Sequence, residues 1–206
     1  MTIKTTCAAA AFAVVSLGSL AQAASYEFTS SIAQDIGVSE RFTATSGPRV
    51  TAWAGSSGIF NDGLATLTQN GNGLGLNGRP DLNPWQLDGF PIGSSEFITF
   101  NFDWAVNLLG IGFLNVDKDD QFDYAINGGG FVNSVTIGKG KAFFDLPLEN
   151  VRTLVIRASG SLLGDGAGND NFSIARISVS AVPLPAGGVL LLGALAAVAA
   201  LRRRKA

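Results

Sequence analysis

The stretch FITFNFDW, residues 97–104, carries the clearest structural signal in this sequence. From Ile98 to Trp104 its apolar and polar side chains alternate strictly, and successive side chains of a β-strand point to opposite faces of a sheet. A period of two therefore predicts a half-buried strand. The apolar face consists of Ile98, Phe100, Phe102 and Trp104, and the polar face consists of Thr99, Asn101 and Asp103.

The same alternation recurs along the chain on both sides of this stretch. It predicts strands at 122–126, 134–138, 151–159 and 172–182, and weaker strands at 25–29, 49–53, 64–69 and 111–116. The residues NGGG, 127–130, predict a hairpin turn because Asn and Gly tolerate positive φ. Arg176 interrupts the alternation of the last strand, which indicates a bulge. With no helical periodicity between the two ends, the pattern predicts an all-β fold, an antiparallel β-sandwich of jelly-roll type.

The first 23 residues have the layout of a secretory signal peptide. Lys4 precedes an apolar run, and Ala21 and Ala23 are the small residues that flank a cleavage site. A first transmembrane anchor is the other interpretation, but the apolar run is short for a membrane span. We therefore expect cleavage after Ala23.

The last 25 residues, 182–206, are typical of a membrane anchor. The sixteen residues 186–201 have no charged side chain. As a helix they would extend about 24 Å, against a bilayer core of about 30 Å. Four basic residues follow, Arg202, Arg203, Arg204 and Lys205, which would stop transfer and stay on the cytoplasmic side. A buried C-terminal helix is the alternative, but the run has no polar face to meet water.

The sequence VPLPA, followed by an apolar helix and an arginine cluster, resembles the VPLPA-type variant of the PEP-CTERM sorting signals of Gram-negative bacteria. The motif residues are Val182, Pro183, Leu184, Pro185 and Ala186. The resemblance covers about 25 residues at the C-terminus. It implies recognition by an exosortase, a membrane protease-transpeptidase, and export through the inner membrane to the cell surface or the extracellular matrix. Leu184 stands where the commoner form of the motif has a glutamate.

The region between these ends, residues 24–181, is long enough for one domain with a real core. Lys4 and the four tail residues account for five of the fourteen basic residues, so nine remain against sixteen acidic ones, a net charge of −7. Such an acidic domain repels phosphate backbones, and we expect no nucleic-acid partner.

The residue inventory also narrows the chemistry. The only cysteine, Cys7, lies in the predicted signal peptide, and the chain has no histidine. Catalysis by a serine–histidine or cysteine–histidine pair is therefore excluded, as are zinc sites made of His and Cys. Oxygen ligands remain, and these suit calcium. No pair of carboxylates is marked by an aromatic-lined cleft pattern, and we expect a protein that is not an enzyme.

Two acidic segments are candidates for a calcium site. The segment DKDDQFD provides Asp117, Asp119, Asp120 and Asp123, but Phe122 and Gly128 stand at positions six and twelve, which excludes an EF-hand. The segment GDGAGNDNF provides Asp165, Asn169 and Asp170 and resembles one copy of the glycine-rich calcium nonapeptide. Ordinary solvated turns are the competing interpretation of both segments, and a third is that the two lie together and share one ion.

Residues 70–95 predict a long connection that contains Trp85, Leu87 and Phe90. We expect this segment to fold over one end of the domain and to bury Trp85. The alternative is a binding loop that displays Trp85 to a sugar ring. Two functions follow for the whole chain: a non-enzymatic surface or matrix protein associated with extracellular polysaccharide, or a calcium-stabilised carbohydrate-binding module.

Overall fold

The computed structural model describes residues 23–57, 65–78, 83–90, 94–137, 142–159 and 170–182. The chain divides into two compact units, of which one is Ala21–Val182. The other unit, Met1–Leu20 with Pro183–Ala206, lies outside the described residues. The predicted signal peptide up to residue 22 and the predicted transmembrane segment therefore lie outside them, as do Asp165 and Asn169.

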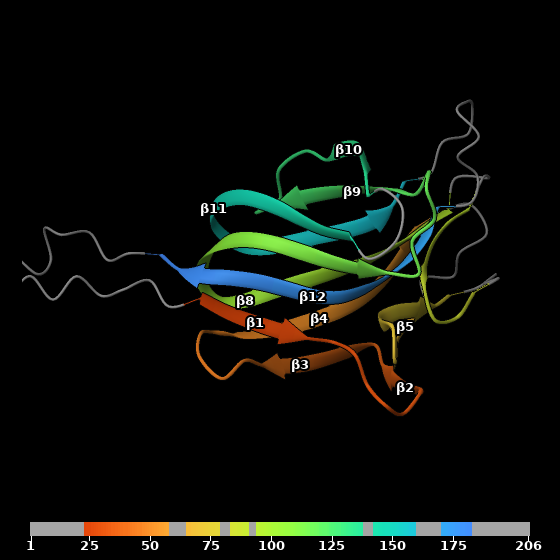
Figure 1. Cartoon of the computed structure of the whole chain (residues 1–206), viewed down its shortest axis with the longest axis horizontal. Helices are drawn as coiled ribbons and strands as arrows, with labels where there is room; N and C mark the ends of the chain where they lie inside the picture. The colour runs from red at the N-terminus through yellow and green to blue at the C-terminus, as the bar shows by residue number, and fades with distance from the viewer. Residues whose placement is uncertain are drawn as a thin grey trace, which may run out of the picture. The chain divides into compact units, whose positions relative to one another are not determined.

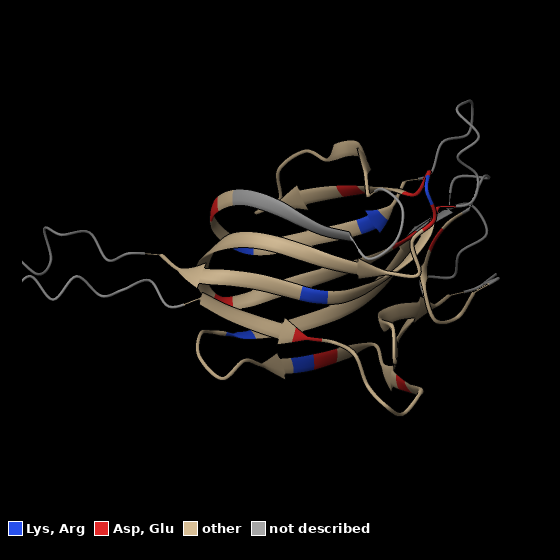
Figure 2. Ribbon diagram, in the orientation of Figure 1, with Lys and Arg blue, Asp and Glu red and all other residues tan. Residues whose placement is uncertain are grey.

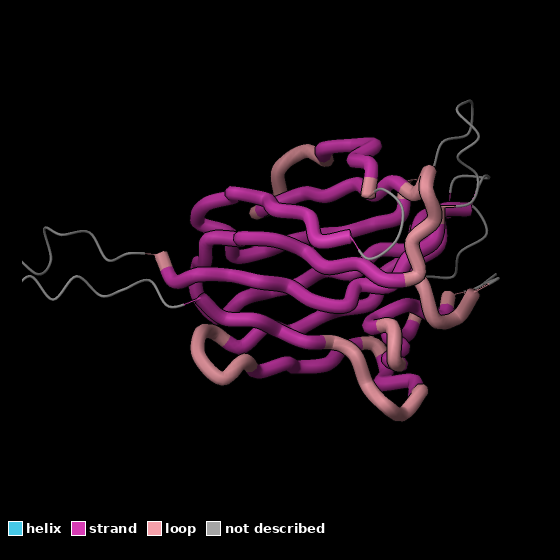
Figure 3. Tube along the Cα trace, in the orientation of Figure 1, coloured by secondary structure: helices cyan, strands magenta, loops and turns pink. Residues whose placement is uncertain are grey.

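The described chain is all-β, as the sequence predicts, and contains no helix (Figures 1 and 3). Its twelve strands are hydrogen-bonded into one sheet, and the strand pairs are antiparallel. The strands are β1 (Ala23–Glu27), β2 (Gln34–Gly37), β3 (Ser39–Thr43), β4 (Arg49–Ser57), β5 (Thr66–Asn70), β6 (Gly73–Asn77), β7 (Leu87–Phe90), β8 (Ser94–Leu114), β9 (Gln121–Ile126), β10 (Val132–Thr136), β11 (Ala142–Ala158) and β12 (Asn171–Ala181).

The long strand β8 organises the sheet. Its first half, 95–102, pairs with β4, and its second half, 106–114, pairs with β12. Strand β11 runs along both halves of β8, and β9 continues the sheet beyond β11. The predicted strands at 97–104 and 111–116 are thus parts of a single strand.

Strand β8 has extra residues at its middle. Thr153 of β11 pairs with Asn101, but Val151 pairs with Val106, so residues 102–105 of β8 stand opposite residue 152. Extra residues on one strand change which side chains face the core. Phe100 and Phe102 are buried, but Trp104 is 49 % exposed. The prediction that Trp104 shares the face of Phe102 is therefore wrong.

The core lies between parts of the sheet that are not hydrogen-bonded to each other. Phe28 follows β1, yet its ring lies 4.9 Å from that of Phe42 in β3 and 5.6 Å from that of Phe100 in β8. Phe113 in the second half of β8 lies 4.9 Å from Phe122 in β9. These rings are all buried or half-buried. Burial of such large apolar surfaces is the main stabilising term of a fold of this kind.

The segment predicted as a long connection contains two strands. β5 and β6 form a hairpin, and β6 also pairs with β12 through Leu74 and Ile174. Strand β7 pairs with both β8 and β12. Four residues of β6 are completely covered, including Gly73 and Gly75. The segment is rich in residues typical of turns, so the sequence did not predict these strands. The glycines of β6 allow close packing against its neighbours.

Two local predictions are confirmed. β9 and β10 form the hairpin predicted around NGGG, with Asn127 at φ 51° and Gly128 at φ 73°. The register of β12 on β8 shifts between Ile174 and Arg176, where the interrupted alternation indicates a bulge.

Candidate functional site

The two acidic segments singled out in the sequence meet in the structure. Asp120 immediately precedes β9, and Asp170 immediately precedes β12. The Gln121 N–H donates to Asp170 Oδ1 at 3.0 Å, and the Asn171 N–H donates to Asp120 Oδ1 at 3.3 Å. Each carboxylate therefore accepts a hydrogen bond from the first residue of the other's strand. Figure 2 shows acidic residues gathered at this end of the sheet.

Both carboxylates are removed from water. Asp120 is 2 % exposed and Asp170 is 3 % exposed. Asp120 Oδ2 accepts a hydrogen bond from the Asp117 N–H at 2.5 Å, but Asp170 Oδ2 is buried with no hydrogen-bond partner among the described residues. An unpaired buried acceptor of this kind is costly.

Burial is the main reason that the pKa of Asp170 is raised to about 6, and the negative charges of Asp120, Asp119 and Asp123 raise it further. Burial likewise raises the pKa of Asp120, where hydrogen bonds from two backbone N–H groups act in the opposite direction. Two carboxylates that both disfavour ionisation are typical of a site without enough positive charge.

The neighbouring Asp123 is buried too, but its charge is matched. Its carboxylate accepts hydrogen bonds from Arg157 Nε at 2.8 Å, the Ser134 N–H at 2.8 Å and Ser159 Oγ at 3.0 Å. The Arg157 guanidinium also lies 3.9 Å from the centre of the Phe131 ring. No pattern in the sequence predicts Arg157 as the partner of Asp123, because the two residues are 34 positions apart.

The other predicted calcium ligands are placed less favourably. Asp117 and Asp119 are exposed, and Asp165 and Asn169 lie outside the described residues. Within the described ranges, no three acidic side chains converge into a group that could hold a metal ion. What the structure does bring together is the pair Asp120 and Asp170.

Trp85 is held by its backbone rather than by its ring. Ser173 Oγ donates to the Trp85 carbonyl oxygen at 3.0 Å, and the Leu76 N–H donates to the Gln86 carbonyl oxygen at 3.0 Å. Leu87 is fully buried, but the Trp85 side chain remains 37 % exposed. The segment thus lies against β6 and β12, and the expectation that it buries Trp85 is wrong.

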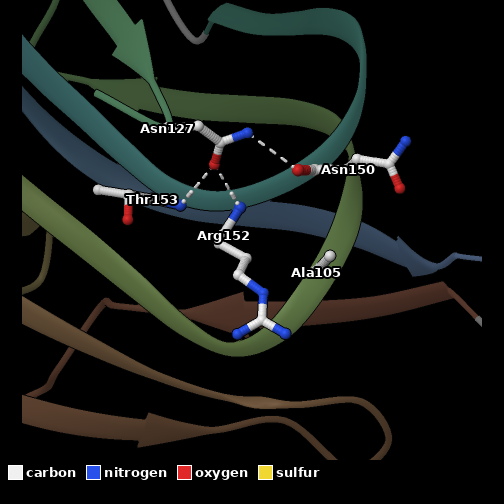
Figure 4. A pocket seen from close by; sticks show the side chains of 5 residues that line it. All are labelled: Ala105, Asn127, Asn150, Arg152 and Thr153. Atoms are coloured by element: carbon white, nitrogen blue, oxygen red, sulfur yellow. Dashed lines mark hydrogen bonds between the residues drawn. The ribbon is translucent and has the colours of Figure 1, made fainter. Parts of the chain in front are cut away.

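A polar depression of about 350 Å³ lies beside the bulge of β8 (Figure 4). Its lining residues are Ala105, Asn127, Asn150, Arg152 and Thr153. Asn127 Oδ1 accepts hydrogen bonds from the N–H groups of Arg152 and Thr153, and its Nδ2 donates to the Asn150 carbonyl oxygen. Asn127 Oδ1 and one hydrogen of its Nδ2 hold β11 against the turn, so Asn127 has a structural role in this depression. The only sequence signal for it was the Asn before three glycines.

Of the predicted sorting motif, Val182 is the last described residue, and Pro183, Leu184, Pro185, Ala186 and the basic cluster Arg202–Lys205 lie outside the described part. In the part that the structure describes, no helix has the length and hydropathy of a membrane span. Comparison with known proteins gives no match: neither a family model nor a curated protein nor a solved structure is similar to the chain.

Proposed function

We propose that the chain is an exported, non-enzymatic β protein of the cell surface or extracellular matrix, carried there by a signal peptide and a C-terminal sorting signal. The observation that carries the proposal is the tail, in which VPLPA, an uncharged run and four basic residues follow one another. An apolar span with a basic stop would hold the preceding domain outside the inner membrane. Processing by an exosortase-type protease would then release or transfer it.

The position of the two domain ends supports this arrangement. β1 and β12 are antiparallel neighbours, with Ala23 opposite Ser180 (Figure 1). The predicted cleavage site and the start of the tail therefore join the domain at the same end of one strand pair. At about 3.3 Å per residue, the eleven residues of β12 put Asp170 roughly 35 Å from that end.

We take the domain to be a β-sandwich of jelly-roll type. The support is the contact of the Phe28 ring, which directly follows β1, with rings of β3 and β8, strands that are not hydrogen-bonded neighbours of β1. Facing layers with interdigitated side chains are the defining feature of a sandwich.

The test is the intact mass of the protein recovered from membrane and medium. We expect loss of the first 23 residues and, in the medium, loss of the tail near Val182. A variant with Arg202–Lys205 replaced by alanine should no longer be retained at the membrane before processing. As the matched control, alanine at Arg41, Arg49, Arg152 and Arg176 removes the same charge from the domain and should leave retention unchanged. Unprocessed chain in the cytoplasm, without membrane association, would contradict the proposal.

A carbohydrate-binding module is the second candidate, favoured by the exposure of all three tryptophans, Trp53, Trp85 and Trp104. Exposed aromatic faces are suited to stacking on sugar rings. Pull-down on insoluble polysaccharides, with each tryptophan replaced by alanine in turn, tests this function. Binding that is lost only in Trp85→Ala would identify Trp85 as the contact. Equal binding by all four proteins would rule out tryptophan-mediated recognition.

A further inference from the structure

We propose that Asp120 and Asp170 together bind one hard divalent cation of the calcium type, where β9 and β12 begin. The proposal does not depend on export or sorting, because it rests on the described domain alone. The proposed site has fewer ligands than the sequence predicts. Asp117 and Asp119 are exposed, and we do not assign them as ligands of the cation.

The first step of the argument is the balance of charge. Asp120 and Asp170 are nearly inaccessible to water. Arg157 pairs with Asp123 and Arg176 with Glu27, and neither Asp120 nor Asp170 has a cationic partner among the described residues. Buried charges in proteins are paired or coordinate metals, because an isolated one is strongly unfavourable.

The second step is the unused acceptor. Asp170 Oδ1 is fixed by the Gln121 N–H, which leaves Oδ2 buried with no partner in the described structure. On Asp120, each oxygen accepts a single backbone N–H, from Asn171 and from Asp117. A carboxylate oxygen has two lone-pair directions. Both carboxylates therefore keep lone pairs free to bind a cation, while the backbone hydrogen bonds hold them in fixed orientations.

The third step is the kind of ligand. Carboxylate oxygens with no imidazole or thiolate nearby select hard cations, and calcium accepts irregular geometry with water and carbonyl oxygens in the remaining positions. Two protein carboxylates make a weak site, so we expect a dissociation constant of about 0.1–1 mM, as in extracellular modules. The raised pKa of Asp170 agrees with a site that lacks positive charge.

The test is thermal unfolding of the full-length chain at neutral pH, after removal of metals with EDTA and again with about 10 mM calcium. With the dissociation constant expected above, this calcium concentration should raise Tm by about 3–11 °C for a chain of this length. Asp170→Asn and Asp120→Asn should lose the shift. Asp170→Asn keeps the oxygen that accepts the Gln121 N–H and changes only the unpartnered one, so we expect it to fold and it is the decisive variant. Asp120→Asn keeps the acceptor for the Asn171 N–H but loses that for the Asp117 N–H, so its stability without calcium should be lower.

The matched control is Asp103→Asn, which makes the same change at an exposed position of β8 and should keep the full shift. Equilibrium dialysis of the wild-type chain provides a second readout that needs no variant, with one calcium expected per chain. No bound calcium would overturn the proposal and would indicate that a proton neutralises the pair instead. A full shift in Asp170→Asn would overturn it as well. Neither result would affect the export experiment.

Discussion

At the scale of single residues, Tyr26 shows how one buried hydroxyl anchors a strand. The side chain is 1 % exposed, and its hydroxyl donates to the Pro48 carbonyl oxygen in the connection before β4. Burial, with a smaller effect from the negative charge of Asp103, raises the pKa of Tyr26 to about 12. Tyr26 therefore ties β1 to a segment 22 residues away in sequence.

This raised pKa predicts a pH dependence at alkaline pH. The folded pKa of Tyr26 is higher than the ordinary value of 10, so its stabilising contribution is complete below pH 10 and is lost as pH rises towards 12. Absorbance titration should show one of the two tyrosines ionising late, together with unfolding. Tyr26→Phe should lack this late step. Completion of both ionisations near pH 10 in a folded protein would contradict the prediction.

Replacement of Tyr26 by phenylalanine should lower the free energy of unfolding by about 1–2 kcal/mol, because the Pro48 carbonyl loses its donor in a buried place. Urea unfolding measures the change. Tyr124→Phe is the matched control, since the Tyr124 hydroxyl makes no hydrogen bond among the described residues, and we expect a smaller effect. An equal loss in both variants would show that the Tyr26 hydrogen bond is not important.

At the scale of elements, a single asparagine holds β11 in place beside the bulge of β8. Residues 102–105 have no regular partners on β11, and Asn127 supplies side-chain hydrogen bonds to β11 beside them (Figure 4). Asn127 itself lies at φ 51°, a conformation that Asn tolerates better than most residues. One side chain thus links the β9–β10 turn to the point where β8 passes from β4 to β12.

Substitutions at Asn127 should separate the effect of its side-chain hydrogen bonds from the effect of its positive φ. Asn127→Gly removes the side-chain hydrogen bonds but accepts the positive φ, and we expect a loss of about 1–3 kcal/mol. Asn127→Ala adds backbone strain of about 1 kcal/mol. Asn127→Asp keeps the oxygen that accepts the N–H groups of Arg152 and Thr153, so its free energy of unfolding should decrease least. Chemical denaturation gives the order, and an alanine variant as stable as the aspartate variant would contradict it.

Close packing of β6 leads to a second prediction at this scale. A Cβ on Gly75 would clash with the backbone of Trp85, which cannot move without breaking the Ser173 and Gln86 hydrogen bonds. Gly75→Ala should therefore cost about 2 kcal/mol or more. The control is Gly130→Ala, where a Cβ meets nothing within 4 Å, and its effect should stay within about 0.5 kcal/mol. Thermal unfolding compares the two.

The sequence predicted the elements that are amphipathic and missed those that are not. β4 follows its alternation, β12 does so from Ile177 onward, and Arg176 marked a real shift of register. β5 and β9 were predicted as strands, but their buried residues do not alternate strictly. Four strands were missed. β2 and β3 are short and have no fully buried residue. β6 is covered on both faces and β7 is short, and both are rich in residues that otherwise form turns. The exposed position of Trp104 was unpredictable because a bulge depends on the partner strand.

At the scale of the whole molecule, the candidate site could be predicted only in part. The sequence marked both acidic segments and raised the idea that they meet, but Gln121 and Asp170 are 49 residues apart, and only the order of strands in the sheet brings them together. Their burial, which makes the pair chemically unusual, follows from packing of the finished sheet.

The exposure of all three tryptophans predicts an unusual fluorescence signature. Trp53, Trp85 and Trp104 are 46 %, 37 % and 49 % exposed in the folded chain. Emission should therefore shift little on unfolding, and acrylamide should quench the native protein efficiently. The control is free tryptophan amide under the same conditions. A native emission that is strongly blue-shifted and protected from acrylamide would contradict the described placement of these rings.

Strand β12 has a consequence for how the chain is made. It pairs with β1, β6, β7 and β8, and Phe172, Ile174, Ile177 and Val179 all belong to the core. Synthesis delivers the chain from its N-terminus, so every partner of β12 emerges before β12 does and lacks that neighbouring strand until β12 follows. A ribosome that stalls before Asn171 thus produces a chain with no closed core, which housekeeping proteases can degrade while sparing finished molecules.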